Sequence, residues 1–422
     1  MGRILTKPKW KGYRVLIPVF VIWFSLTFSI TSEAQVLEIK YHEIEQLAEE
    51  YSIEWQQFDN RLGYEVAGEM QMATRLNPTL AYDLEYLNGQ TQNEYEQYIY
   101  LSKEFRTPGH FRALREMRDI RIDGHFQEKE RDRLEWLASS KYGFIQIVLL
   151  QEELAQMELL MHQLNLLREV SSLRSAEGEV STLNHRLIDL GSYQLQSEIE
   201  ERKGKLNRMT LLWKNRMGFK EEVELRFEGS FSTKPDTFIE MDRIVQLMDE
   251  SPAAIADRLS AQSASLAISL ENSRRFPSIE ISAGYKQLNP NWNGFLVGVA
   301  IPLPILNTNR EAIEQARALE RVESSNLIKR QNERRYLAIE LLNELRRSQD
   351  QLDRFPDYLH QPEAFMNTLL ISYEEGTQSL NDFLNTIQLM VNNYQTKYDL
   401  LENAYGITLK LEAMTGHTVI QP

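Results

Sequence analysis

Residues 276–304 read FPSIEISAGYKQLNPNWNGFLVGVAIPLP, and this stretch decides the fold. Apolar side chains alternate with polar or small ones over 278–287, and a second alternating run covers 294–303. Alternation of this kind is the pattern of a β-strand with one apolar face. The Asn-Pro-Asn break at 289–291 is typical of a turn. The stretch therefore predicts a β-hairpin with strands at about 278–287 and 294–303.

The same plan occurs earlier in the chain, where residues 77–108 read NPTLAYDLEYLNGQTQNEYEQYIYLSKEFRTP. Two strands are expected there, at about 79–87 and 94–104, on either side of an Asn-Gly turn signal. Each hairpin follows an X-Pro dipeptide and precedes a long run of helical pattern, which indicates an internal repeat. The domain organisation predicted from this repeat is as follows: first repeat 35–217, connector 218–250, second repeat 251–416 and tail 417–422.

Long helices account for most of the remaining sequence. Apolar residues at steps of three, four and seven between Val36 and Leu76 predict an amphipathic helix. From Pro108 to Glu177 the helical pattern is almost unbroken, and at about 1.5 Å per residue it would extend on the order of 100 Å. Such a helix must pack along other helices. The second repeat opens at Ser251-Pro252 as an N-cap pair, and its long helix is expected over about 309–355. The fold class is mainly α with a small β part.

The N-terminus has the pattern of an export signal. Five basic residues precede the apolar run 15–30, and the small-x-small sequence Ser32-Glu33-Ala34 follows, which predicts a signal peptide at 1–34. A retained membrane anchor is the alternative. The chain has no cysteine, so disulfides and thiolate sites are excluded.

The net charge of the chain limits the kinds of partner that it can be expected to bind. The chain carries 47 basic and 61 acidic residues, and removal of the five basic residues and one acidic residue in 1–34 leaves 42 and 60, a net charge of −18. An acidic protein of this kind is not expected to bind nucleic acid.

The four strands point to a membrane. In the first strand Leu80, Tyr82, Leu84 and Tyr86 share one face, and strands of about ten residues with one apolar face and aromatic residues are typical of transmembrane β-barrels. Four strands are too few to close a barrel, so the simplest closed assembly is a homotrimer with twelve strands. The alternative is a soluble periplasmic coiled-coil scaffold whose strands form a small sheet.

These motifs resemble the TolC-type outer-membrane efflux factors. The resemblance is carried by the following segments: 77–80, 276–279, 298–304, 251–253, 177–181 and 375–379. It implies long antiparallel coiled-coil helices that form a periplasmic α-barrel, and four transmembrane strands per chain that complete a trimeric 12-stranded β-barrel. It also implies a passive channel in the bacterial outer membrane that conducts substrates expelled by an inner-membrane RND pump through a periplasmic adaptor. Residues 301–310 are most similar to the metal-ion branch, and an exit duct for type I protein secretion is the alternative.

The resemblance also implies two functional regions. Hairpin tips that dock the adaptor would include Gly178, Glu179, Val180, Ser181, Gly376, Thr377 and Ser379. A pore gate would include Tyr373, Asp382, Gln378, Asn184 and Asn385. Gln378 stands where some relatives have an arginine, so their ionic latch is not expected here. A ring of three Asp382 carboxylates would favour cations, and a solvated aspartate on a helix surface is the alternative.

No catalytic chemistry is expected. The seven histidines show no His-x-x-x-His or Glu-x-x-His spacing, and the chain has no phosphate loop, nucleophile elbow or dinucleotide fingerprint. The sequence therefore predicts a protein that is not an enzyme and needs no cofactor or resident metal.

Overall fold

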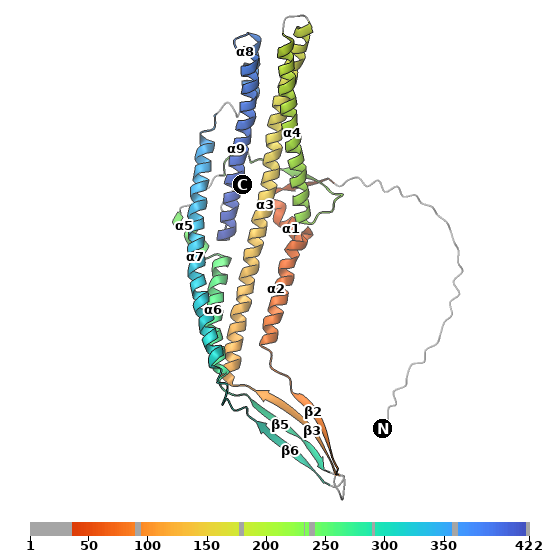
Figure 1. The fold of residues 1–422 in the computed structure, drawn as a ribbon, viewed down its shortest axis with the longest axis vertical. Helices are drawn as coiled ribbons and strands as arrows, with labels where there is room; N and C mark the ends of the chain where they lie inside the picture. The colour runs from red at the N-terminus through yellow and green to blue at the C-terminus, as the bar shows by residue number, and fades with distance from the viewer. Residues whose placement is uncertain are drawn as a thin grey trace, which may run out of the picture.

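The structure is a computed structural model that describes residues 36–88, 94–176, 181–231, 233–235, 241–288, 292–356 and 362–418. The expected signal peptide and the tip residues Gly178, Glu179 and Val180 lie outside the described residues. The described part is elongated, with a sheet at one end and helices running from it to the opposite end (Figure 1).

The helices are α1 (Ile44–Tyr51), α2 (Ile53–Met72), α3 (Pro108–Ala176), α4 (Thr182–Met217), α5 (Met241–Asp249), α6 (Pro252–Ser273), α7 (Arg310–Asp353), α8 (Pro362–Glu374) and α9 (Leu380–Thr415), with a 3-10 turn η1 (Tyr41–Glu43) before α1. The strands are β1 (Val36–Lys40), β2 (Thr79–Leu87), β3 (Glu94–Phe105), β4 (Glu224–Glu228), β5 (Ile279–Leu288) and β6 (Trp292–Ala300).

Helix α3 is the axis of the bundle. It has 69 residues, and it packs against α2, α4, α6 and α9. Its length follows from a sequence without proline after Pro108. The second repeat divides the corresponding path between α7 and α8, and α7 packs against α6 and α9. The two repeats therefore share a plan but differ in how their long helix is built.

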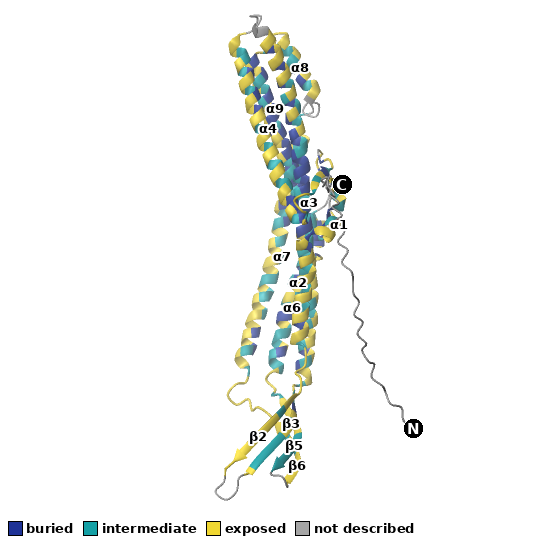
Figure 2. Ribbon diagram, turned by 90° about the vertical axis from the view of Figure 1, so that its right-hand side faces the viewer, coloured by how far each residue is buried: buried dark blue, intermediate teal, exposed yellow. Residues whose placement is uncertain are grey.

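Buried residues, dark blue in Figure 2, concentrate along the inside of the bundle around its middle. The largest core cluster joins α3 to α4 and α9, and Phe144, Leu160, Ile188 and Tyr394 are almost fully buried in it. Burial of a side chain of this size contributes about 1.5–3 kcal/mol, so this core contributes strongly to the stability of the bundle. Among the described residues, no helix combines the length and the apolar character needed to cross a membrane.

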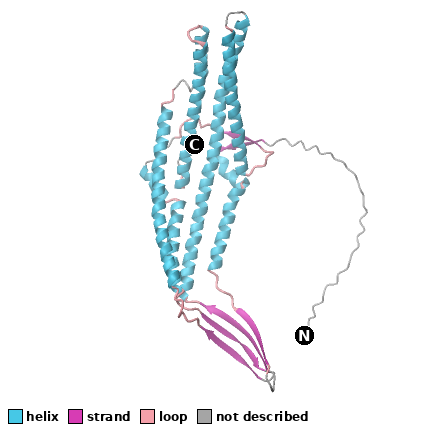
Figure 3. Cartoon of the chain, in the orientation of Figure 1, coloured by secondary structure: helices cyan, strands magenta, loops and turns pink. Residues whose placement is uncertain are grey.

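The large sheet has the order β2-β3-β5-β6, with every neighbouring pair antiparallel (Figure 3). Its central contact joins β3 of the first repeat to β5 of the second. The fourth strand runs over 292–300 rather than the expected 294–303. It stops before Pro302 and Pro304, which have no N–H to donate to a ladder. The third strand runs over 279–288, one residue later than expected, and the second extends to Phe105.

The expectation of one helix over 36–76 is wrong. Residues 36–40 form β1, which pairs in parallel with β4 (Val36 opposite Glu224, Lys40 opposite Glu228). Ser52 then interrupts the helical run in an extended conformation, and its hydroxyl caps α2 by accepting from the N–H of Trp55. Pairing with a distant strand overrode the local helical pattern.

The connector 218–250 contains two regular elements, β4 and α5. An aromatic cluster fixes β4 to the bundle: Phe227 lies 5.1 Å from Trp213 and 5.7 Å from Phe144, measured between ring centroids. Trp213 also donates its indole N–H to the carbonyl of Ser140 at 2.9 Å. The small parallel sheet is thus a packed part of the core.

Candidate channel wall and hairpin tips

One face of the four-stranded sheet is apolar and exposed. Residues directly opposite each other on antiparallel strands share a face, and the register Tyr82–Ile99–Tyr285–Phe295 crosses all four strands. The exposed fractions of these side chains are 60%, 47%, 41% and 93%. The neighbouring row contains Leu80, Leu101, Ala283 and Val297. A contiguous apolar surface of this kind needs a lipid or protein partner.

The opposite face is polar. It carries Asp83, Glu96, Glu104, Glu280 and Lys286 together with serine, glycine and tyrosine residues. Lys286 forms an ion pair with Glu96 at 2.8 Å across β3 and β5. The two faces therefore differ in polarity as expected of a wall between lipid and water, and Lys103, near the helix end of β3, is a charged residue on the apolar face.

Close packing on the polar face depends on a glycine. A Cβ on Gly284 would lie 2.3 Å from the carbonyl oxygen of Ile99 and 2.4 Å from the Cβ of Tyr100, the residue opposite it in β3. Any other residue would separate the two strands, and this contact joins the two repeats.

Strands β2 and β6 form the two edges of the sheet within one chain. Each edge presents backbone N–H and C=O groups that have no strand partner within the described chain, and such groups cost several kcal/mol each in hydrocarbon. The sheet of a single chain therefore has two free sides at which further strands could pair.

The junction between sheet and helices is held by His110, in the first turn of α3. Arg106 donates to Nε2 of His110 at 3.2 Å, and Nδ1 then donates to the hydroxyl of Ser273 at 3.1 Å. Ser273 in turn donates to the carbonyl of Leu270 at 2.6 Å. Burial lowers the pKa of His110, and the neighbouring Arg106 and Arg274 lower it further, so the hydrogen bonds and the charges both favour the neutral ring.

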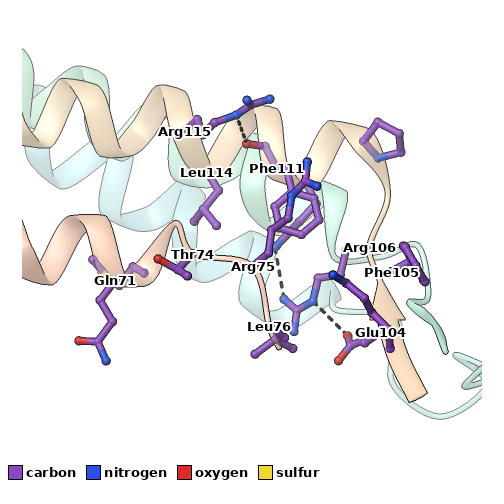
Figure 4. Close-up of a pocket in the computed structure, with 14 residues that line it drawn as sticks. Gln71, Thr74, Arg75, Leu76, Glu104, Phe105, Arg106, Phe111, Leu114 and Arg115 are labelled. Carbon is purple, nitrogen blue, oxygen red and sulfur yellow. Dashed lines mark hydrogen bonds and ion pairs between the residues drawn. The ribbon is translucent and has the colours of Figure 1, made fainter. Parts of the chain in front are cut away.

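Beside this junction lies a cavity of about 490 Å³ between the end of α2 and the start of α3 (Figure 4). Arg75, Arg106 and Arg115 line it together with Glu104, which accepts from Arg106 at 3.1 Å. The guanidinium of Arg75 lies 5.2 Å from the ring centroid of Phe111. The junction is therefore rich in positive charge.

The α8–α9 turn is built around a left-handed glycine. Gly376 has φ +73°, a conformation that costs little without a Cβ. Thr377 donates to the carbonyl of Ser372 through both its N–H and its hydroxyl, and the N–H of Gln378 donates to the same carbonyl at 3.1 Å. Ser379 then caps α9, because its hydroxyl accepts from the N–H of Asp382.

The expected gate residues of this turn lie close together in sequence but face different surroundings. Tyr373 is half-buried, with its ring centroid 5.8 Å from that of Phe383. Asp382 is exposed, and its carboxylate accepts from the hydroxyl of Ser379 at 2.7 Å. Asn385 is exposed one turn further along α9, and Gln378 is half-buried in the turn. Tyr373 therefore acts as a packing residue within the chain, whereas Asp382 presents charge to the surface.

On the other hairpin, Ser181 caps α4 by accepting from the N–H of Leu183 at 3.2 Å, and Asn184 follows half-buried in the first turn. About two turns further on, α4 meets α9. A Cβ on Gly191 would lie 3.0 Å from Leu384, and Gln194 donates to Gln388 at 3.0 Å. The structure therefore brings the tip regions of both repeats to the same end, away from the sheet (Figure 1).

Sequence reasoning missed two parts of this region. The Ser379-x-x-Asp382 spacing is a capping-box pattern and could have shown that Asp382 has a structural partner. The role of the Ser372 carbonyl as the acceptor for the turn has no sequence signal.

No protein-family model matches the chain. Over 157 residues it is 26% identical to the cobalt-zinc-cadmium resistance protein CzcC of Cupriavidus metallidurans, a match that covers 35% of this chain and 36% of that protein. The matched stretch is thus well under two thirds of the relative's length.

Solved structures match over much more of the chain. The structure of CusC, a protein that changes conformation as it folds and forms a transmembrane channel, has a TM-score of 0.74 at 14% identity. The match covers 89% of this chain and 92% of that chain. The outer-membrane protein VceC of Vibrio cholerae has a TM-score of 0.73 at 14% identity, with 90% and 96% covered. The TolC-type fold predicted from the sequence motifs is thus confirmed, and the chain has the fold of outer-membrane channel proteins.

Proposed function

We propose that three copies of this chain form an outer-membrane channel that passively conducts substrates expelled by an inner-membrane RND pump through a periplasmic adaptor. The observation that carries the proposal is the sheet, which has one apolar face, one polar face and two edges without a strand partner. Joining β6 of one copy to β2 of the next three times gives a closed barrel of twelve strands, with the apolar face toward lipid and the polar face toward the lumen. The long helices continue this wall into the periplasm.

The hairpin tips are proposed as the adaptor-docking surface. Supporting this, both hairpins end at the pole opposite the sheet, and the described tip residues Ser181, Thr377 and Ser379 are exposed. Asp382, one turn inside the α8–α9 tip, would place three carboxylates around the pore axis and favour the passage of cations.

Metal ions are the proposed substrate class, since the curated relative is a resistance protein for cobalt, zinc and cadmium. The chain itself supplies no energy source, and the pump would drive transport.

The proposal is tested in two steps. Fractionation and cross-linking of the full-length protein should recover a trimer in the outer membrane, and the purified trimer should give ion conductance in a planar bilayer. Deletion of the gene should then lower tolerance to zinc or cobalt, with restoration by the intact chain. A monomer in the soluble periplasmic fraction would refute the channel, whereas a conducting trimer whose loss leaves metal tolerance unchanged would refute only the substrate class.

A further inference from the structure

A cluster of metal-ligand type lies between α2 and α3, remote from both the sheet and the hairpin tips. Glu65 of α2 and His125 and Glu128 of α3 each offer one ligand atom, and these atoms all lie within 4.8 Å of one another. Nδ1 of His125 is 3.1 Å from Oε2 of Glu65 and 3.2 Å from Oε2 of Glu128. Three possible ligands from two helices thus converge on one point.

These separations fit a small transition-metal ion. Zinc binds imidazole nitrogen and carboxylate oxygen at about 2.0–2.2 Å, so two ligands of a tetrahedral zinc ion stand about 3.3 Å apart. The two measured separations at Nδ1 are close to that value. A nitrogen ligand together with two carboxylates favours zinc, cobalt or nickel over calcium and magnesium, which prefer oxygen alone.

The surroundings orient one ligand and add charge beside another. Arg61 donates to Oε1 of Glu65 at 3.1 Å, which leaves Oε2 directed toward His125. On the other side of the ring, Nε2 of His125 faces Oε1 of Glu69 at 3.9 Å, and Arg121 lies 3.6 Å from the same oxygen. At 3.9 Å this carboxylate lies beyond hydrogen-bond distance, so it adds negative charge beside the ring without fixing a proton on Nε2.

The cluster is also reachable from solvent. His125, Glu128 and Glu69 line a cavity of about 360 Å³ that is bounded on its far side by α6 and α7. The side chain of Glu128 is 41% exposed, whereas those of Glu65 and His125 are 24% exposed. An ion could therefore enter past Glu128 and be held against the half-buried pair.

We propose that His125, Glu65 and Glu128 form a binding site for one zinc-class divalent ion per chain. The ion links α2 to α3 beside the ion pairs that Asp59 makes with Lys129 at 2.6 Å and with Arg133 at 3.0 Å. This site rests on the local geometry and not on the proposed channel function, so it holds whichever substrate the protein conducts.

The test is calorimetric titration of zinc chloride into the full-length protein, purified in detergent and stripped of metal with a chelator. One ion per chain is expected to bind, and His125→Ala and Glu128→Gln should each weaken binding about tenfold or more. Glu69→Gln, which removes a neighbouring negative charge but no ligand, should weaken it less than His125→Ala. Because the side chain of Glu128 is exposed, Glu128→Gln should leave the fold intact, so weaker binding by this variant reports loss of a ligand and not unfolding.

The matched control is His185→Ala, since Nε2 of His185 lies 3.6 Å from the carboxylate of Asp189 on the same helix. It should bind zinc as the unaltered protein does. Cobalt bound to the unaltered protein should give the visible absorption of a tetrahedral ion, and His125→Ala should lose that absorption. Absence of zinc binding, equal binding by His125→Ala and the unaltered protein, or displacement of zinc by equimolar magnesium would each overturn the site.

Discussion

A lysine at Val297 is the sharpest test of the proposed wall. Val297 lies in the middle of β6, it is 75% exposed, and it shares the apolar face with Ala283 opposite. A lysine at the bilayer midplane of a β-barrel costs about 2–4 kcal/mol. Each assembled trimer would carry three copies, so Val297→Lys should destabilise it by about 6–12 kcal/mol in total.

The matched control is Glu280→Lys on the polar face. Glu280 lies directly opposite Glu104 in the register of β3 and β5, and like charges in that position are unfavourable. A lysine at residue 280 replaces a repulsive pair with an attractive one, so this variant should assemble at least as well as the unaltered protein.

Both variants are compared by the yield of heat-resistant trimer in the outer-membrane fraction. Val297→Lys is expected to lose most of the trimer, and Glu280→Lys to keep it. The opposite order would mean that the polar face meets lipid. Equal yields from both variants would mean that the sheet does not sit in a membrane.

Three further predictions follow from the turns, the junction and the tip. Gly376→Ala should lower the free energy of unfolding by only about 1–2 kcal/mol, the cost of the left-handed backbone, because the added Cβ would meet nothing within 4 Å. Gly218→Ala should lower the free energy of unfolding by about 1–3 kcal/mol more, because its Cβ would lie 2.2 Å from the carbonyl oxygen of Tyr51. Equal losses for the two variants in chemical unfolding would contradict this steric reasoning. Burial and the nearby arginines lower the pKa of His110 below its unfolded value of 6.5, so the free energy of unfolding should fall as the pH drops below 6.5. His110→Asn removes this titration, so the melting temperature of the variant should depend less on pH over that range. Asp382→Asn keeps an acceptor for the capping serine and removes the charge, so it should reduce cation selectivity in planar bilayers without lowering stability; unchanged selectivity would remove Asp382 from the gate.

The sequence identified the parts of the fold that depend on local pattern. The alternating residues from Leu80 to Tyr86 and from Ile279 to Tyr285 lie in strands, and the left-handed Gly376 lies in a turn between helices. Each signal depends on residues within a few positions of one another, and this is why a single sequence reveals it.

Contacts between segments far apart in the chain could not be predicted from the local sequence pattern. The local pattern predicts helix where the five-residue strand β1 forms, because its partner β4 lies 188 positions further along the chain, Glu224 opposite Val36. The metal-ligand cluster could not be predicted for the same reason, since His125 and Glu128 of α3 meet Glu65 of α2 only in the folded chain. Whether Asp382 faces a pore depends on neighbouring copies of the chain, and one chain's pattern carries no information about their placement.

The parallel pairing of β1 with β4 has a consequence for the order in which the chain can assemble. All residues of this pair and of the hairpin α3–α4 precede residue 229, so these elements can pack together before the second repeat is available. Strand β3 cannot finish its pairing until β5 arrives, from Ile279 onward. During that interval β3 has an unpaired, partly apolar edge, and such an edge is prone to wrong pairing. Assembly of the chain therefore passes through a vulnerable stage in which a folded half holds an incomplete sheet.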